Sequence, residues 1–229
     1  MKTIGLLGGM SWQSSAEYYR LINQGVAARL GGHNNARTLM LTVNFHEIEA
    51  AMREGDWERI AVLVSQAARQ LEAGGADFVL LCTNTIHKVA AAIESAISIP
   101  FVNLMDATAA AIRKQGCRTV ALLGTRVTME HEFYRGRLES HGLRVLVPDE
   151  PFRAILHGVI FEELCHGEIR EDSRRDVQLM IDELRHRGAE GVILGCTELT
   201  LLIQPEHSPL PLFDTTRIHC DAAVDLCLA

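Results

Sequence analysis

Two kinds of hydrophobic pattern alternate along the chain. The first is a short, almost unbroken apolar run rich in Val, Ile and Leu, which is typical of strands buried on both faces of a parallel sheet. Between these runs, apolar residues recur every three or four positions, which predicts amphipathic helices. The expected strands are residues 3–7, 39–43, 78–81, 120–123, 145–147 and 192–194.

Three of the expected helices have a well-defined apolar face. The residues that form these faces are Tyr18, Ile22, Val26 and Leu30 in the first, Trp57, Ile60, Ala61, Val64, Ala68 and Leu71 in the second, and Val177, Met180, Ile181 and Leu184 in the third. Asp172-Ser173 is the expected N-cap pair of the third helix. Strands and helices in alternation predict an α/β fold, with helices covering both faces of parallel sheet.

The chain also repeats itself at about half its length. KTIGLLGG at 2–9 matches RTVALLGT at 118–125, an offset of 118 − 2 = 116. GADFVLLCTNT at 75–85 matches GAEGVILGCTE at 188–198, an offset of 188 − 75 = 113. Such a period is far longer than that of a solenoid repeat. The repeat therefore predicts two similar α/β halves, the first ending near residue 100 and the second near residue 209.

The second match pairs two positions at the ends of equivalent strands. In this register Cys82 falls on Gly195, and Thr83 falls on Cys196. Ligands of open α/β sheets bind outside the carboxyl ends of the strands, so both positions are candidates for a cleft between the halves. A thiol and a hydroxyl on opposite faces of one carbon would suit two-base proton transfer. Side chains alternate along a strand, so Cys82 is expected to point away, into the core.

Composition narrows the class of partner and the compartment. The net charge of −7 disfavours nucleic acid and anionic membranes as partners. No apolar run approaches the roughly 18 residues of a membrane span, and the N-terminal apolar stretch is too short for a signal peptide. The six cysteines show no CxxC spacing, which favours reduced thiols and a cytoplasmic protein. Since neither HExxH nor another Cys/His ligand spacing occurs, no metal site is predicted.

Several motifs together connect the chain with a known family: IGLLGGMSW, NFHEIE, CTNTIHK, ALLGTRVTM, IFEEL and GCTEL. The chain resembles the aspartate racemase branch of the aspartate/glutamate racemase superfamily, and within it the enterobacterial broad-specificity amino-acid racemases. This resemblance implies two flavodoxin-like domains, a homodimer, no pyridoxal phosphate or other cofactor, and racemisation at Cα of a free amino acid. It also implies that the last helix returns to the first domain. The expected domains are then 1–98 with 210–229, and 99–209.

The resemblance also implies roles for the two strand-end motifs. The family's first motif, Cys-Asn-Thr-x-His, reads Thr83-Asn84-Thr85-Ile86-His87 here, so threonine replaces the first acid/base cysteine, while Cys196 matches the second. A thiol of pKa about 8.5 costs roughly 2 kcal/mol to ionise at pH 7, and an alcohol of pKa about 15 costs roughly 11 kcal/mol. We therefore expect Cys196 to be the effective base, Thr83 to donate or relay a proton, and catalysis to be slower or strongly unequal in its two directions.

Substrate binding is expected from residues next to the two motifs. Asn84, Thr85 and Thr197 stand at helix starts, where backbone N–H groups suit an α-carboxylate. Met10 and Met52 are expected to line the cleft by resemblance. Cys165 stands where aspartate-specific members of the family carry a lysine, which favours a neutral or longer substrate side chain. Asn44 likewise stands where family members usually have aspartate.

Other interpretations stay open at this point. One thiol at a carbanion would also serve decarboxylation or cis–trans isomerisation of a small dicarboxylate. A chain that has lost its first acid/base residue could instead be an amino-acid-binding protein. Thr83 could simply cap the next helix. Arg53 and Arg126 could meet a carboxylate or be solvated, and His87 is expected to pack at a helix start and orient its neighbours.

Overall fold

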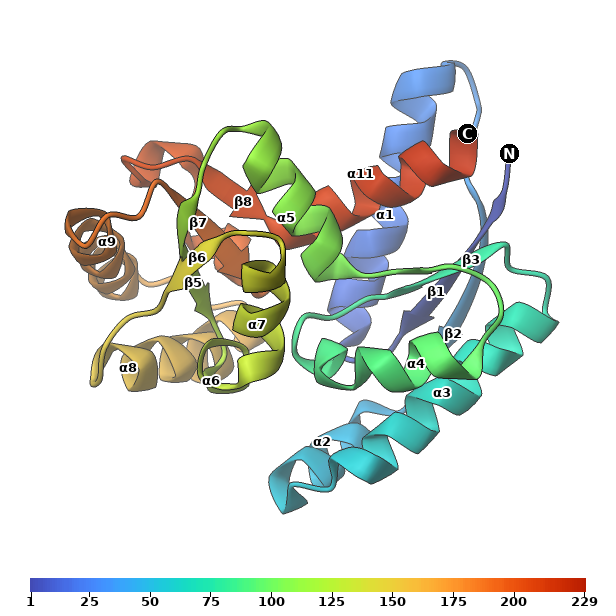
Figure 1. Cartoon of the computed structure of the whole chain (residues 1–229), viewed down its shortest axis with the longest axis horizontal. Coiled ribbons are helices and arrows are strands. Elements are labelled where there is room, and N and C mark those ends of the chain that lie inside the picture. Colours follow the sequence, from blue (N-terminus) through green and yellow to red (C-terminus); the bar gives the residue numbers. More distant parts are fainter. The chain divides into compact units, whose positions relative to one another are not determined.

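The structure, a computed structural model, describes all 229 residues and divides into two compact units. Unit 1 comprises residues 1–104 and 216–229, and unit 2 comprises residues 105–215 (Figure 1). Each unit is built on a four-stranded parallel sheet. The fold class predicted from the pattern, α/β with parallel sheets in two similar halves, is confirmed.

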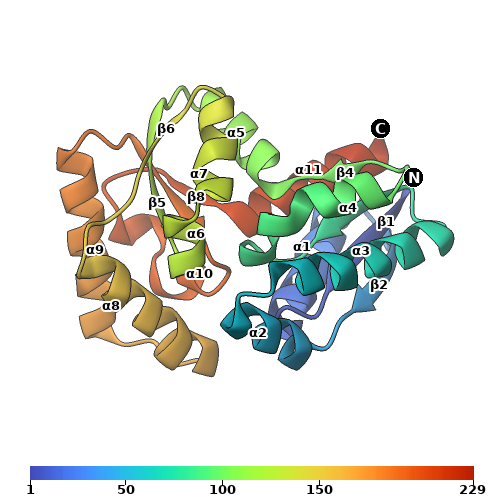
Figure 2. The ribbon, with the colours of Figure 1, turned by 60° about the horizontal axis from the view of Figure 1, so that its bottom comes forward.

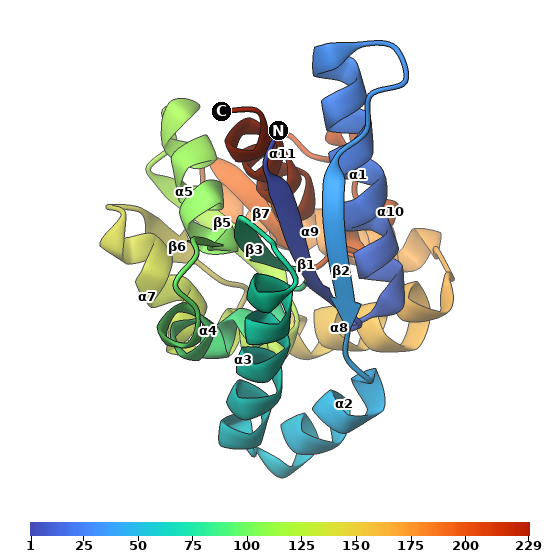
Figure 3. The ribbon, with the colours of Figure 1, turned by 90° about the vertical axis from the view of Figure 1, so that its right-hand side faces the viewer.

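The sheet of unit 1 has the strand order β2-β1-β3-β4. Its strands are β1 (Thr3–Gly8), β2 (Arg37–Thr42), β3 (Phe78–Leu81) and β4 (Phe101–Val102). On one face, Ile4 and Leu6 of β1 pack with α1 (Trp12–Leu30) and α11 (Thr215–Leu228). On the other, Leu7 packs with α2 (Phe45–Glu54), α3 (Trp57–Ala73) and α4 (Ala90–Ala96). Figure 3 shows α1 and α3 on opposite sides of this sheet.

The sheet of unit 2 has the corresponding order, β6-β5-β7-β8. Its strands are β5 (Thr119–Gly124), β6 (Arg144–Leu146), β7 (Gly191–Gly195) and β8 (Leu212–Asp214). Its helices are α5 (Leu104–Lys114), α6 (Arg126–Glu130), α7 (Glu132–Ser140), α8 (Phe152–Gly158), α9 (Glu171–His186) and α10 (Leu199–Leu202). Alternate side chains of β5 and β7 pack with α8, α9 and α10 in one core. Figure 2 shows α9 and α7 on opposite sides of the sheet.

The repeat read from the sequence also exists in the strand register. Ile4 pairs with Phe78 in unit 1, and Val120 pairs with Gly191 in unit 2, which are the same positions after adding 116 and 113. An acidic side chain caps the first strand in both units: the Asp77 carboxylate accepts from the Thr3 amide at 2.5 Å, and Glu190 accepts from the Thr119 amide at 2.9 Å. The equivalence of the two strand ends therefore rests on backbone pairing.

The chain passes from one unit to the other at 104/105 and again at 215/216. Each of these boundaries lies six residues beyond the predicted domain boundary (104 − 98 and 215 − 209). The reason is that β4 pairs with β3 and β8 pairs with β7, which keeps these short strands in their own repeats' sheets. Each crossing falls in the first turn of a helix, α5 or α11. Each repeat therefore contributes its last helix to the other unit.

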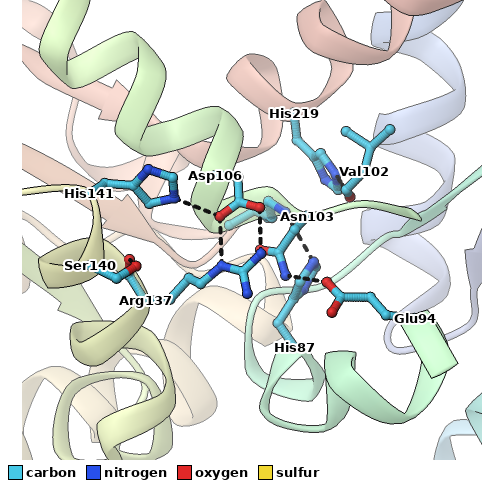
Figure 4. A network of polar contacts seen from close by, with 10 residues as sticks. His87, Glu94, Val102, Asn103, Asp106, Arg137, Ser140, His141 and His219 are labelled. Atoms are coloured by element: carbon cyan, nitrogen blue, oxygen red, sulfur yellow. Dashed lines mark hydrogen bonds and ion pairs between the residues drawn. The ribbon is translucent and has the colours of Figure 1, made fainter. Parts of the chain in front are cut away.

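A cluster of charged side chains links α5 to α7 and the residue that follows it, within unit 2 (Figure 4). The guanidinium of Arg137 in α7 donates to both oxygens of Asp106 at 2.7 and 2.6 Å, and His141 Nε2 lies 2.8 Å from the same carboxylate. The hydrogen bonds from Arg137, and then that of His141, hold the pKa of Asp106 below its usual range. Since all three side chains are one-third or more exposed, the pairs orient the helix more than they stabilise the fold.

Two local predictions are wrong. The helix expected to begin after Asp172-Ser173 begins at Glu171, with Arg170 at the N-cap and no side-chain cap, because Ser173 instead donates to Glu163 at 2.6 Å. Leu30, assigned to an apolar face, is 47% exposed because it is the last residue of α1 and extends beyond the packed part of that helix. No helix has the length and apolar composition required to cross a bilayer.

Candidate active site

In unit 1 the candidate site begins where β3 ends. The Cys82 amide donates to the carbonyl of Leu7 at 2.9 Å, which continues the strand pairing by one bond. The next side chain, Thr83, is 8% exposed, and its hydroxyl makes no hydrogen bond to another protein group. The N-cap of the following helix is Asn84, without a side-chain capping bond, so Thr83 is not a helix cap. Its hydroxyl is therefore free to meet a ligand.

Cys82 points the other way, as the register predicts. It is fully buried in the core that contains Ile4 and Leu80, on the α1 side of the sheet. Burial raises the pKa of its thiol far above the ordinary value. Its carbonyl also accepts a hydrogen bond from Ser14 at 2.9 Å, which fastens the strand end to α1. Cys82 is a core residue with no access to a substrate.

The turn after β1 brings the two methionines together. Gly9 has φ +93°, and a Cβ there would lie 2.2 Å from the Val43 carbonyl oxygen, so only glycine fits this close approach. Met10 follows and is 6% exposed, in the same apolar cluster as Ile48 of α2. Met52 is half-buried and packs against that cluster. Met10 and Met52 therefore pack in the same apolar cluster of unit 1.

The segment expected to be helical after Thr83 begins as a short 3-10 helix, Thr85–Val89, which is followed directly by α4 from Ala90. Asn84 at its start is 5% exposed, and Thr85 is half-buried. In unit 2 the corresponding helix α10 has four residues and begins two residues after Thr197. Helices of this length carry little macrodipole, so anion binding here would depend on individual N–H groups rather than on a helix dipole.

In unit 2 the strand end carries a thiol that is paired with a carboxylate. Cys196 follows β7, is 9% exposed, and its Sγ donates to Glu198 Oε2 at 2.9 Å. Burial, and then the negative charge of Glu198, raise the pKa of Cys196 well above the ordinary value. The resting residue is therefore a thiol with its proton directed at a carboxylate, and the role of Cys196 as the effective base stays a prediction.

Glu198 is the residue that sequence reasoning left out of the site. The signal was present, since Glu198 stands two positions after the thiol and aligns with Thr85 in the repeat (85 + 113 = 198). Cys165, on the short helix Leu164–His166, is affected by the same carboxylate: burial of part of its side chain, and then the charge of Glu198, raise its pKa to about 11. The end of β7 thus has a carboxylate within electrostatic range of two thiols.

The two arginines considered as carboxylate ligands have partners within their own units. Arg53 lies 3.9 Å from Glu49 one helical turn away, and both are exposed. Arg126 donates to Glu150 at 2.6 Å and lies 3.3 Å from Glu130. No group of three or more His, Cys, Asp or Glu side chains is arranged to hold a metal ion.

Comparison with known proteins gives a consistent assignment. The family model described as Asp/Glu/hydantoin racemase matches residues 7–223. The broad-specificity amino-acid racemase RacX of Bacillus subtilis (strain 168) is 23% identical over 99% of this chain and 98% of its own. A crystal structure of a candidate Asp/Glu racemase from Yersinia pestis is 49% identical, with a TM-score of 0.96 over 100% of both chains. An aspartate racemase homologue from Pyrococcus horikoshii OT3 is 33% identical, with a TM-score of 0.90 over 100% of both chains.

Proposed function

The chain belongs to the Asp/Glu/hydantoin racemase family, and from that premise we propose that it racemises free amino acids without pyridoxal phosphate, using Cys196 and Thr83. The observation that carries the proposal is the 2.9 Å contact between the Cys196 thiol and the Glu198 carboxylate, at the strand end equivalent to that of Thr83. A thiol hydrogen-bonded to a base is the usual arrangement of an activated sulfur.

The proposed proton transfers use different groups on the two faces of the substrate. Glu198 accepts the thiol proton, and the Cys196 thiolate then removes the proton from Cα. The Thr83 hydroxyl donates a proton to the opposite face of the carbanion and is reprotonated from solvent, while Glu198 returns the proton of the thiol to solvent. In the reverse direction Thr83 would have to remove the proton, which costs far more for an alcohol than for a thiol. Because two enantiomers have equal free energy, kcat/KM must be the same in both directions, so Thr83 slows racemisation overall and any inequality appears as compensating differences in kcat and KM.

The remaining site residues are proposed to bind the substrate. Backbone and side-chain donors of Asn84, Thr85 and Thr197 would hold the α-carboxylate, each at a strand end next to its acid/base residue. Met10 and Met52 would supply an apolar wall. Because the neutral Cys165 lies within range of the Glu198 charge, we propose a substrate with a neutral side chain or a broad specificity rather than an aspartate specialist.

A decarboxylase is the second candidate, and one observation favours it. Only one of the two equivalent strand ends carries a thiol, and release of carbon dioxide needs a proton donor on one face alone. Its substrate would be a small dicarboxylate, whose product is protonated by Cys196. The assay below separates the two reactions, because decarboxylation releases carbon dioxide and racemisation does not.

The test is deuterium exchange at Cα. The purified protein is incubated with a panel of free L-amino acids and small dicarboxylates in D2O, without pyridoxal phosphate. Mass spectrometry follows deuterium, chiral chromatography follows inversion, and carbon dioxide is measured separately. Cys196→Ala should abolish the reaction, while Cys117→Ala, which removes another buried thiol of unit 2, should leave it intact.

Inversion with deuterium uptake that depends on Cys196 would establish the racemase and identify its substrate. Carbon dioxide release without inversion would select the decarboxylase. Tight amino-acid binding with no exchange would contradict both and indicate a binding protein. The homodimer stays a prediction, which analytical ultracentrifugation tests directly.

A further inference from the structure

A buried imidazole connects the backbone of Thr83 to the end of unit 1. His87 is 2% exposed and lies on the short helix that follows Thr83. Its Nδ1 lies 2.6 Å from the Thr83 carbonyl oxygen, and the Leu104 amide donates to its Nε2 at 3.2 Å. Figure 4 shows the ring directed toward the segment that carries Asn103, the residue before Leu104.

These two contacts fix the protonation of the ring. A backbone amide can only donate, so Nε2 must be the unprotonated nitrogen that accepts from Leu104. Nδ1 then carries the hydrogen and donates to the carbonyl of Thr83. The opposite tautomer would place two N–H groups face to face at Leu104 and leave the Thr83 carbonyl without this donor. Only the neutral Nδ1–H form satisfies both neighbours.

The carbonyl of Thr83 matters because the position of the side chain depends on its backbone. The hydroxyl has no hydrogen bond of its own, so it is placed by the main chain and the χ1 rotamer. The Thr83 amide donates to Leu81 at 2.9 Å, which fixes one side of the residue. The bond from His87 fixes the other side. Misplacement of a reacting group by about 1 Å can cost about 100-fold in rate.

We propose that His87 is a positioning residue for the Thr83 hydroxyl. It holds the Thr83 carbonyl against the amide of Leu104, the residue at which α5 begins and the chain leaves unit 1. This inference rests on the proposed function, in which Thr83 gives a proton to one face of Cα. It assigns His87 no contact with the substrate.

Two amide substitutions test the two hydrogen bonds of the His87 ring separately. In His87→Asn the side-chain N–H can take the place of Nδ1 and donate to the Thr83 carbonyl, but the hydrogen bond between the Leu104 amide and Nε2 is lost. In His87→Gln the longer side chain places its oxygen near Nε2 and accepts from Leu104, but the donor to Thr83 is lost. If positioning acts through Thr83, His87→Gln should lower inversion by about 10- to 100-fold, and His87→Asn should keep most of it.

The decisive readout is the ratio of exchange to inversion, which a general loss of folding would not change. Cys196 removes and returns the proton on one face, so His87→Gln should still exchange Cα hydrogen with retention while inversion falls. KM should stay near that of the unsubstituted protein in both variants. His219→Gln is the matched control, because His219 is equally buried in unit 1 but bonds Tyr18 and Val102 instead of Thr83. Its ratio should be that of the unsubstituted protein.

The possible failures are distinguishable. If the unsubstituted protein exchanges no amino-acid hydrogen, the proposed function falls, and the role of His87 falls with it. If that protein racemises but both His87 variants keep its exchange-to-inversion ratio, the His87 inference alone is overturned. Should His87→Gln fail to fold, ¹⁵N NMR of the unsubstituted protein replaces it. An Nδ1–H tautomer of His87 supports the inference, and an Nε2–H or doubly protonated ring overturns it.

Discussion

The buried ring of His219 predicts a loss of stability in mild acid. His219 lies in α11 and is fully buried; its Nε2 is 2.7 Å from the Val102 carbonyl, so Nε2 carries the hydrogen. Its Nδ1 then accepts from the Tyr18 hydroxyl at 2.9 Å. Tyr18 and His87 are the titratable rings in contact with it, and neither offers a negative charge to a protonated imidazole. Burial lowers the pKa of His219 to about 4.

The size of the effect follows from the difference in pKa between the folded and unfolded chains. The ordinary value is 6.5, and the folded value is about 4. Between them the unfolded chain binds the proton and the folded chain does not, so stability falls as the pH drops through 6.5 and levels off below about pH 4. At about 1.36 kcal/mol per pH unit, the full loss is about 3 kcal/mol, and the loss from pH 7.5 to pH 5 is about 2 kcal/mol.

Urea unfolding at pH 7.5 and pH 5, followed by circular dichroism, measures this loss. Other groups titrate over the same range, so the comparison is with His219→Gln, which keeps an N–H donor for Val102 but cannot be protonated. The variant should be less stable at pH 7.5, because Tyr18 loses its acceptor. The gap between the two proteins should then narrow by about 2 kcal/mol at pH 5. A gap that stays constant within about 0.5 kcal/mol would refute the reasoning, because His219 would then titrate as an exposed histidine does.

Three further predictions concern the site and its turn. Glu198→Gln removes the base and the negative charge beside Cys196, so kcat should fall at least about 100-fold. The pH dependence of alkylation by iodoacetamide should also show a lower pKa for the Cys196 thiol. An unchanged kcat would exclude Glu198 as the base. Thr83→Cys should raise kcat/KM of racemisation at least about tenfold from both enantiomers, measured by chiral chromatography; equal rates before and after the change would argue against a role for position 83. Gly9→Ala should cost at least about 2 kcal/mol more than Gly55→Ala in urea unfolding, because both have positive φ but only at Gly9 would the new Cβ meet backbone atoms.

Of the strands that the sequence predicted, β1, β3, β5 and β7 are almost continuously buried, whereas β2 has no fully buried residue. β3 and β7 are buried at every position, so their apolar runs mark both the strand and its end. β4 and β8 were not predicted because two or three residues show no periodicity, and each forms only by pairing with a strand already in place. The N-cap of α9 was misplaced for a similar reason. Ser173 has a typical capping side chain, but a distant glutamate takes its hydroxyl.

The candidate site was predictable as far as local sequence determines it. The repeat alone paired Thr83 with Cys196, because register is a matter of counting residues along equivalent strands. The role of Glu198 depends on its side chain turning back to contact the Cys196 thiol. The raised pKa of Cys196 depends on burial. The spacing of residues in the sequence predicts neither. The hydrogen bond from the Leu104 amide to His87 Nε2 joins residues 17 positions apart and depends on where β4 ends. Such contacts come from the tertiary fold.

Because α5 of the first repeat lies in unit 2 and α11 of the second repeat lies in unit 1, the two units are not completed in the order in which their first residues are synthesised. All residues of unit 2 have been made once the chain reaches residue 215, although unit 2 contains the second repeat. Unit 1 must wait for residues 216–229, because Ala223 and Val224 of α11 complete the core around Tyr18. On the ribosome, the half that is made first is therefore the last to close its core, and Thr83 stays on an incomplete scaffold until residues 216–229 have been made.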